Sequence, residues 1–164
     1  MAEVVVADAL GLMGLLALVE PEDYRDLFDN VTTCLETGAL RFPREVVDEI
    51  HVIARNEFLS GWASGLGATR DQWTSDIVHQ RQVMRLVANL GYDEGFVSLD
   101  NHDPAISHVA RMCFDLQKRN IEFCVLTTDV GSGPLAPTME QICTGAGWTI
   151  RTPRACALAL DLLA

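Results

Sequence analysis

The sequence lacks several patterns that mark well-known α/β proteins. Lysine is nearly absent, because 11 of the 12 basic residues are arginine and only Lys118 is lysine. A phosphoacceptor receiver domain needs a lysine at a late strand end, and Lys118 lies in a helical pattern instead. No G-x-G-x-x-G turn follows the first apolar run, which argues against a dinucleotide-binding domain. Leu10 stands two residues after Asp8, where haloacid-dehalogenase-like phosphatases need a second aspartate.

Paired cysteines, a basic N-terminus and long apolar runs are missing as well. The five cysteines include no C-x-x-C spacing and lie within apolar patterns, so we interpret them as buried thiols in a reducing cytoplasm. The N-terminus has no basic residues, so it does not resemble the n-region of a signal peptide. The run Ala9–Val19 is too short to span a bilayer. We therefore expect a cytoplasmic protein with no membrane partner.

The charge is strongly one-sided, with a formal net charge of −11. An acidic chain does not attract nucleic acid through its overall field, so binding would need a local basic patch or a metal ion. Arg44 and Arg154 are candidate substrate-binding residues, together with Arg41 and Arg151. Arginines beside prolines are also common as plain surface charges. This composition leaves both interpretations open.

Alternating strand and helix patterns predict the fold. With 164 residues, 49% of them hydrophobic, the chain can bury one core without disulfides. We predict a single domain over residues 1–164, with a helical insertion around residues 59–95. The expected architecture is α/β, with three layers (α/β/α) around a four- to five-stranded, mainly parallel sheet. The predicted strands are Val4–Ala7, Ala39–Phe42, a weak Phe96–Leu99, Ile121–Leu126 and Trp148–Arg151.

Three helical segments carry specific expectations. Asp103 and Pro104 have the residue types of an N-cap and a first helical position. Asp71 is expected to cap a long helix that runs to Leu90. The glycine- and serine-containing segment Leu59–Thr69 is predicted to be a loop.

Four acids fall where parallel α/β folds bind ligands. Asp8 ends the first strand, Asp129 follows the strand Ile121–Leu126, Asp103 opens a helix, and Glu49 lies at the margin of an apolar helix face. The carboxyl edge of such a sheet is the usual ligand site. Clustered carboxylates need a positive charge among them, and Mg²⁺ or Mn²⁺ prefers such oxygen ligands. Each acid also has an ordinary structural explanation, so their joint placement supports the site.

The order of these motifs resembles the PIN-domain family, and within it a prokaryotic PIN-like subgroup with a longer insertion between the second and third acids. The resemblance covers nearly the whole chain and rests on four short motifs. These are Val4-Val5-Val6-Ala7-Asp8, Phe42-Pro43-Arg44-Glu45-Val46-Val47-Asp48-Glu49-Ile50, Asp103-Pro104-Ala105 and Thr127-Thr128-Asp129. The resemblance implies a Mg²⁺- or Mn²⁺-dependent ribonuclease, often the toxin of a toxin–antitoxin pair, that hydrolyses RNA phosphodiesters with metal-bound water. By motif position, the residues that would bind metal and catalyse are Asp8, Glu49, Asp103 and Asp129, with Thr127 in support.

One departure from the family pattern leaves a second function open. Leu10 stands where the family commonly has Asn, Ser or Thr, so a polar group near the metal is missing. The alternative is a catalytically degenerate PIN-like scaffold that binds RNA or a protein partner. The expected partners are therefore an RNA substrate and an antitoxin protein, and a second copy of the chain stays open.

Overall fold

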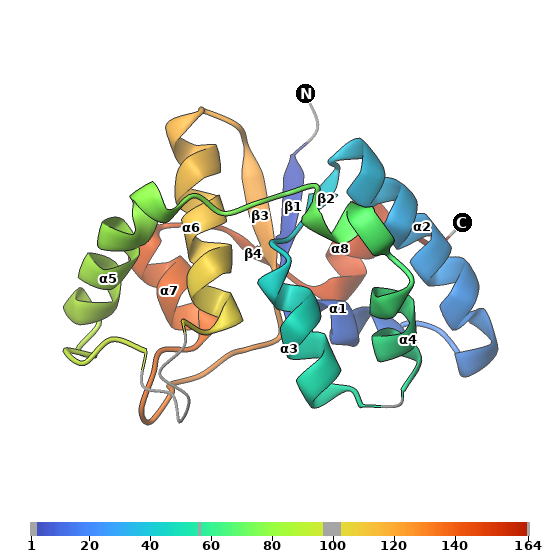
Figure 1. Ribbon diagram of the computed structural model, residues 1–164, viewed down its shortest axis with the longest axis horizontal. Coiled ribbons are helices and arrows are strands. Elements are labelled where there is room, and N and C mark those ends of the chain that lie inside the picture. Colours follow the sequence, from blue (N-terminus) through green and yellow to red (C-terminus); the bar gives the residue numbers. More distant parts are fainter. Residues whose placement is uncertain (1–2, 56, 97–102, 164) are drawn as a thin grey trace.

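The computed structural model describes residues 3–55, 57–96 and 103–163, and its centre is a parallel β-sheet (Figure 1). Four strands lie in the order β2-β1-β3-β4, and each neighbouring pair is parallel. Their bounds are Val4–Ala7 (β1), Leu40–Arg41 (β2), Phe123–Leu126 (β3) and Ile150–Arg151 (β4). The first strand is central because both of its faces are apolar and all four residues are buried. This confirms the predicted parallel α/β sheet.

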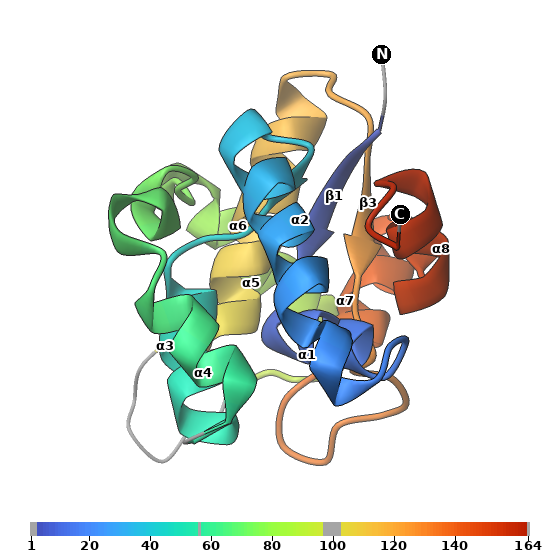
Figure 2. The same ribbon diagram turned by 90° about the vertical axis from the view of Figure 1, so that its right-hand side faces the viewer.

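Eight α-helices within the described residues cover the sheet. Helices α3 and α5 each pack against α6, and α1 packs against α8 (Figures 1 and 2). The helix bounds are Ala9–Leu16 (α1), Tyr24–Thr37 (α2), Glu45–Ile53 (α3), Phe58–Ser64 (α4), Gln80–Asn89 (α5), Ala105–Lys118 (α6), Met139–Ala146 (α7) and Pro153–Ala159 (α8). Short 3₁₀ turns lie at Pro21–Asp23, Gly67–Asp71 and Ile77–His79. None of the helices in these three described ranges is long and apolar enough to cross a membrane.

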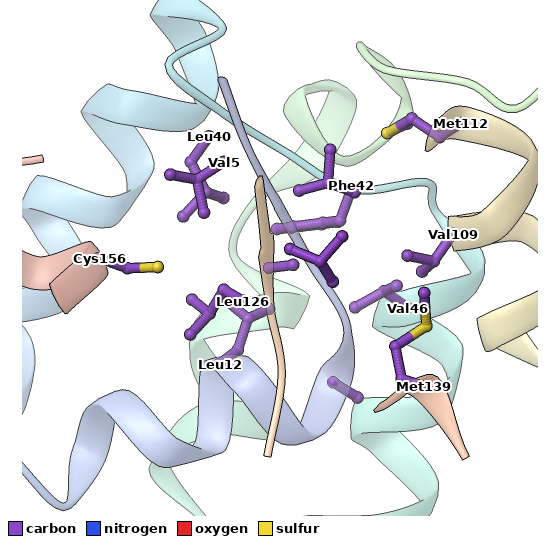
Figure 3. Close-up of a cluster of buried hydrophobic side chains, with 14 of the residues drawn as sticks. Val5, Leu12, Leu40, Phe42, Val46, Val109, Met112, Leu126, Met139 and Cys156 are labelled. Atoms are coloured by element: carbon purple, nitrogen blue, oxygen red, sulfur yellow. The ribbon is translucent and has the colours of Figure 1, made fainter. Parts of the chain in front are cut away.

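The hydrophobic core lies on both faces of the sheet. Figure 3 shows Val5 and Leu126 on the side of Leu12, while Val109 and Met139 gather on the opposite side. Side chains alternate along a strand, so a two-sided core needs apolar residues at successive positions. The run of valines in β1 meets this need. The result is the predicted three-layer arrangement, in which packing on both faces fixes the position of the strands.

The predicted loop at Leu59–Thr69 is wrong, because most of it is helical. Leu59 and Ala63 are four residues apart and both are buried, which gives α4 an inward face. The indole Nε1 of Trp62 donates a hydrogen bond to Thr32 Oγ1 on α2 at 2.9 Å. Tertiary packing therefore overrides the poor helix propensity of the glycines.

The predicted long helix from Asp71 to Leu90 is also wrong. The segment forms a 3₁₀ turn at Ile77–His79 and then α5, and Asp76 caps the turn by accepting from the Val78 N–H. Ile77, an apolar residue of the turn, is 68% exposed. The weak strand predicted at Phe96–Leu99 lies outside the described residues after Phe96.

Candidate functional site

Asp8 is fixed at the point where β1 ends and α1 begins. Its Oδ1 accepts a hydrogen bond from the Gly11 N–H at 2.7 Å, which makes Asp8 the N-cap of α1. Its Oδ2 accepts a short hydrogen bond from the Thr127 hydroxyl just after β3. The residue is only 2% exposed. Thr127 therefore supports Asp8, as the family resemblance implied.

A glycine allows these two strand ends to come so close. A Cβ placed on Gly11 would lie 2.1 Å from the carbonyl oxygen of Leu126, the last residue of β3. No larger side chain fits there, so α1 can pack against the end of β3 only with glycine at this position. The close approach brings Asp8 next to Thr127.

Asp129 lies just beyond, on the same edge of the sheet. Its N–H donates to Thr127 Oγ1 at 3.0 Å, so one threonine bridges Asp8 and Asp129. Its Oδ2 accepts from the Met139 N–H at 2.9 Å, in the first turn of α7. Thr127 therefore fixes the backbone of Asp129, and the N-terminus of α7 fixes its carboxylate, as a rigid site requires.

Glu49 reaches the same region from α3, and the three carboxylates repel one another. Burial, together with the charges of Asp8 and Asp129, raises the pKa of Glu49 to about 7. The pKa of Asp8 is raised to about 6, mainly by burial and in part by the charge of Asp129, although the hydrogen bonds from Thr127 and Gly11 lower it. Within the described ranges, none of the three acids forms an ion pair. We call Asp8, Glu49 and Asp129 the sheet-edge acids.

A pocket of about 920 Å³ opens beside these acids. Glu49 and Asp129 line it directly, whereas Asp8 lies buried and is not among its lining residues. The other lining residues are Leu10, Glu45, Asp48, Val52, Asp103, Pro104, Ala105, Ile106 and His108. Sequence-predicted Glu49, Asp103 and Asp129 thus share one pocket. The described lining residues include five carboxyl groups and no arginine or lysine.

Asp103 lines the pocket but does not cap α6, so the predicted N-cap is wrong. The helix begins at Ala105, and Pro104 occupies the N-cap position without a side-chain hydrogen bond. The Asp103 Oδ2 instead accepts from Arg111 Nη2 at 2.6 Å. The Asp103 carboxylate is therefore paired with Arg111 and does not accept a hydrogen bond from the first turn of α6. Its assignment as a metal ligand stays a prediction.

Arg111 and His108 are the residues that sequence reasoning missed. The Arg111 side chain is 4% exposed, and its Nε donates to Gln80 Oε1 on α5. His108 contacts both Arg111 and Glu45. Ser107 and His108 lie four and three positions before Arg111 on α6, so a polar stripe beside the apolar face was the available signal. We call Asp103, Arg111, His108 and Gln80 the α6 network.

The four arginines proposed for phosphate contacts lie outside the pocket lining. Arg44 forms an exposed pair with Asp71 at 3.8 Å, and Arg154 is exposed on α8. Arg41 stacks on Trp73 at 4.1 Å, and Arg151 pairs with Glu3 at 2.8 Å. Arg41 and Arg151 therefore have structural roles. Arg44 and Arg154 stay predicted substrate contacts.

The carboxylate oxygens of the sheet-edge acids are the ligand type that a hard divalent cation prefers. In this structure, however, the acids do not lie close enough together to form a complete site. Carboxylates that repel one another in a partly buried place lower their energy when Mg²⁺ or Mn²⁺ binds between them. Across the described ranges, no three His, Cys, Asp or Glu side chains are close enough together to form a complete metal site. Binding would therefore draw the repelling carboxylates inward. No protein-family model, curated protein or solved structure matched the chain when it was compared with them.

Proposed function

We propose that this protein is a divalent-cation-dependent nuclease that hydrolyses RNA phosphodiesters at the sheet-edge acids. The observation that carries the proposal is electrostatic: Asp8, Glu49 and Asp129 each lack a described basic partner, and burial together with their mutual repulsion raises the pKa of Glu49 to about 7. Folding alone gains nothing from such an arrangement. Perturbed carboxyl groups at a pocket are instead typical of functional sites.

The chain's own residues have distinct roles in this proposal. Asp8 and Asp129 would hold Mg²⁺ or Mn²⁺ from positions fixed by Thr127, and Glu49 would approach from α3. When bound, the cation supplies a Lewis acid and an activated water. Each oxygen of Asp8 accepts one hydrogen bond and keeps a second lone pair for a ligand. No side chain needs to act as a covalent nucleophile.

RNA as the substrate rests on the resemblance to the PIN-domain family. Leu10, Val52 and Ile106 add apolar surface to the pocket lining, on which ribose and base can pack. We extend the proposal to a cytoplasmic toxin controlled by an antitoxin protein, with a second copy of the chain as an open partner. These parts depend on the nuclease activity being present.

A second candidate function has specific support. Leu10 lines the pocket in place of a polar residue, and Asp103 is already paired with Arg111. A pocket with five acidic side chains is also unfavourable for an RNA phosphate in the absence of metal. These observations favour a non-catalytic scaffold whose pocket accepts a basic segment of a protein partner.

Cleavage of single-stranded RNA separates the two functions. We expect activity in Mg²⁺ or Mn²⁺, none in EDTA, and a loss of at least about a hundredfold in kcat for Asp8→Asn and Asp129→Asn. Asparagine keeps the N-cap acceptor of α1, so Asp8→Asn should still fold. Asp26→Asn, an exposed acid on α2, is the matched control and should keep full activity. Cleavage that survives both aspartate substitutions would contradict the proposed site, and a parent protein that binds metal without cutting RNA would favour the scaffold.

A further inference from the structure

We propose that His108 donates the hydrogen on its Nε2 to a phosphate oxygen of the substrate and so positions the RNA strand in the pocket. This inference rests on the proposed nuclease function. It assigns a substrate contact to a residue that no acid motif includes. His108 is the one side chain among the described lining residues that can donate a hydrogen bond while the carboxyl groups are ionised.

His108 lies on α6 and lines the same pocket as Glu49 and Asp129. Its Nδ1 faces three groups: Ser75 Oγ at 3.1 Å, Arg111 Nη1 at 3.3 Å and Glu45 Oε1 at 3.4 Å. One ring nitrogen is therefore fully surrounded by protein groups. The other nitrogen, Nε2, has no hydrogen-bond partner within the described residues and is the one available to a ligand.

The surroundings of Nδ1 decide where the imidazole proton lies. Arg111 is always protonated, so its Nη1 can only donate, and Nδ1 must accept. Ser75, at the shortest distance, can donate as well. The carboxylate of Glu45, at 3.4 Å, is the most distant of the three and makes a charge contact with Nδ1 without a hydrogen bond. The neutral ring then carries its proton on Nε2, and this tautomer offers a donor to the pocket.

Arg111 can impose this tautomer because it cannot move away. Its side chain is nearly fully buried, Nε donates to Gln80, and Nη2 donates to Asp103 at 2.6 Å. Burial lowers the pKa of His108, and Arg111 lowers it further, while Glu45 and Asp103 oppose the change. His108 is therefore neutral at physiological pH. A neutral imidazole donor stabilises negative charge without pairing permanently with the nearby acids.

An RNA phosphate needs such a donor in this pocket. With a divalent cation held by the sheet-edge acids, the other phosphate oxygens would still meet the carboxylates of Glu45, Asp48 and Asp103. A positioned N–H on that side offsets the repulsion and fixes the register of the strand, as polar contacts to phosphate generally do. His108 thus acts on substrate binding more than on the chemical step.

Two amide substitutions separate the roles of the two ring nitrogens. In His108→Gln the side-chain amide reaches the former position of Nε2, whereas in His108→Asn it reaches only that of Nδ1. With short single-stranded RNA in Mg²⁺, we expect His108→Asn and His108→Ala to raise KM, and the Kd measured by fluorescence anisotropy, by about tenfold. Their kcat should change by less than about threefold. His108→Gln should keep both constants near those of the parent protein.

The tautomer itself has a readout that does not depend on activity. Long-range ¹H–¹⁵N correlation spectra of the full chain should show His108 protonated on Nε2 and unprotonated on Nδ1, and its Nε2 resonance should shift when RNA is added. Protonation on Nδ1, or a His108→Ala variant that binds and cleaves RNA like the parent, would overturn this inference and leave the proposed nuclease intact. A parent protein that neither binds nor cleaves RNA in Mg²⁺ would overturn both.

Discussion

Asp129 and Asp103 line the same pocket, but their surroundings are opposite. Asp129 accepts a hydrogen bond from the Met139 N–H, and it faces Asp8 and Glu49 with no described cation beside it. Asp103 is 44% exposed and pairs at 2.6 Å with a buried arginine. The α6 network thus balances its own charge, whereas the sheet-edge acids do not.

This difference separates acids that stabilise the fold from acids that destabilise it. A buried arginine with two hydrogen-bonded partners ties α6 to α5 and to the segment before α6. Carboxylates that raise one another's pKa have an energetic cost that packing elsewhere must offset. We therefore expect substitutions in the two groups to change stability in opposite directions.

The largest stability effect should come from the α6 network. Arg111→Met removes the cation beside Asp103 and the hydrogen bonds that Arg111 donates to Gln80 and His108, so we expect the free energy of unfolding to fall by about 2–3 kcal/mol. This expected loss is at or below the one usual for removing one partner of a buried ion pair, because Asp103 is partly exposed to solvent. Urea denaturation measures this change. Arg154→Ala, on the exposed face of α8, is the control and should change stability by less than about 0.5 kcal/mol; a similarly small loss for Arg111→Met would remove the contrast.

The pH dependence of stability should reveal the sheet-edge acids. The folded-state pKa values of Asp8 and Glu49 are about 6 and about 7, above their ordinary values of 3.8 and 4.5. The folded state therefore binds protons more tightly than the unfolded state. These two groups should make stability fall as the pH rises from about 4 to 7, by about 2–3 kcal/mol for each group.

Urea denaturation across this pH range, with and without Mg²⁺, measures the effect. A bound cation should remove most of the fall, because it favours the ionised carboxylates. If the Asp8→Asn, Glu49→Gln double variant instead becomes steadily more stable over the same pH range, the fall in the parent protein is due to these two acids. A parent protein that shows the same rise would contradict the raised pKa values.

A single neutralisation at the sheet edge should stabilise the protein slightly. Glu49→Gln removes one of three repelling charges, so we expect a gain of about 1 kcal/mol in metal-free buffer above pH 7 and almost none near pH 4. Asp48→Asn, on the exposed side of the same helix, is the matched control and should change stability by less than about 0.5 kcal/mol. Thermal unfolding at the two pH values gives the comparison. A destabilised Glu49→Gln would show that Glu49 has a structural partner.

The smallest effects should come from the surface arginines. Arg44 and Arg154 lie outside the pocket lining, so Arg44→Ala and Arg154→Ala should raise KM for RNA by about threefold at most and leave kcat unchanged. Steady-state kinetics at low and high salt tests this, since exposed charges act through screened attraction. A tenfold rise in KM would place the RNA path over these residues.

Much of the fold and part of the site could be predicted from sequence. The valines of β1 and the apolar run of β3 mark buried parallel strands, and such strands end at a common edge, so the proximity of Asp8 and Asp129 followed from local patterns. The loop assigned to Leu59–Thr69 failed because Trp62 and Thr32, distant in sequence, stabilise a helix that its glycines disfavour.

The charge balance of the pocket could not be predicted. Asp103 and Pro104 have the residue types of a helix start, and nothing local shows that Asp103 pairs with Arg111 instead. Arg111 is buried only because Gln80, 31 positions earlier, accepts from its Nε. Tertiary contacts therefore decide which carboxylates are paired with a basic residue and which are not.

Thermal unfolding with and without millimolar Mg²⁺, at a pH of about 8 where both raised carboxyl groups are ionised, tests most directly whether the sheet-edge acids form a cation site. We expect Mg²⁺ to raise the melting temperature of the parent protein by about 5 °C, because the ion binds only the folded chain. Asp8→Asn and Asp129→Asn should lose this response, and Asp103→Asn should keep it. An unchanged melting temperature in the parent, or a shift that only Asp103→Asn abolishes, would contradict the assignment.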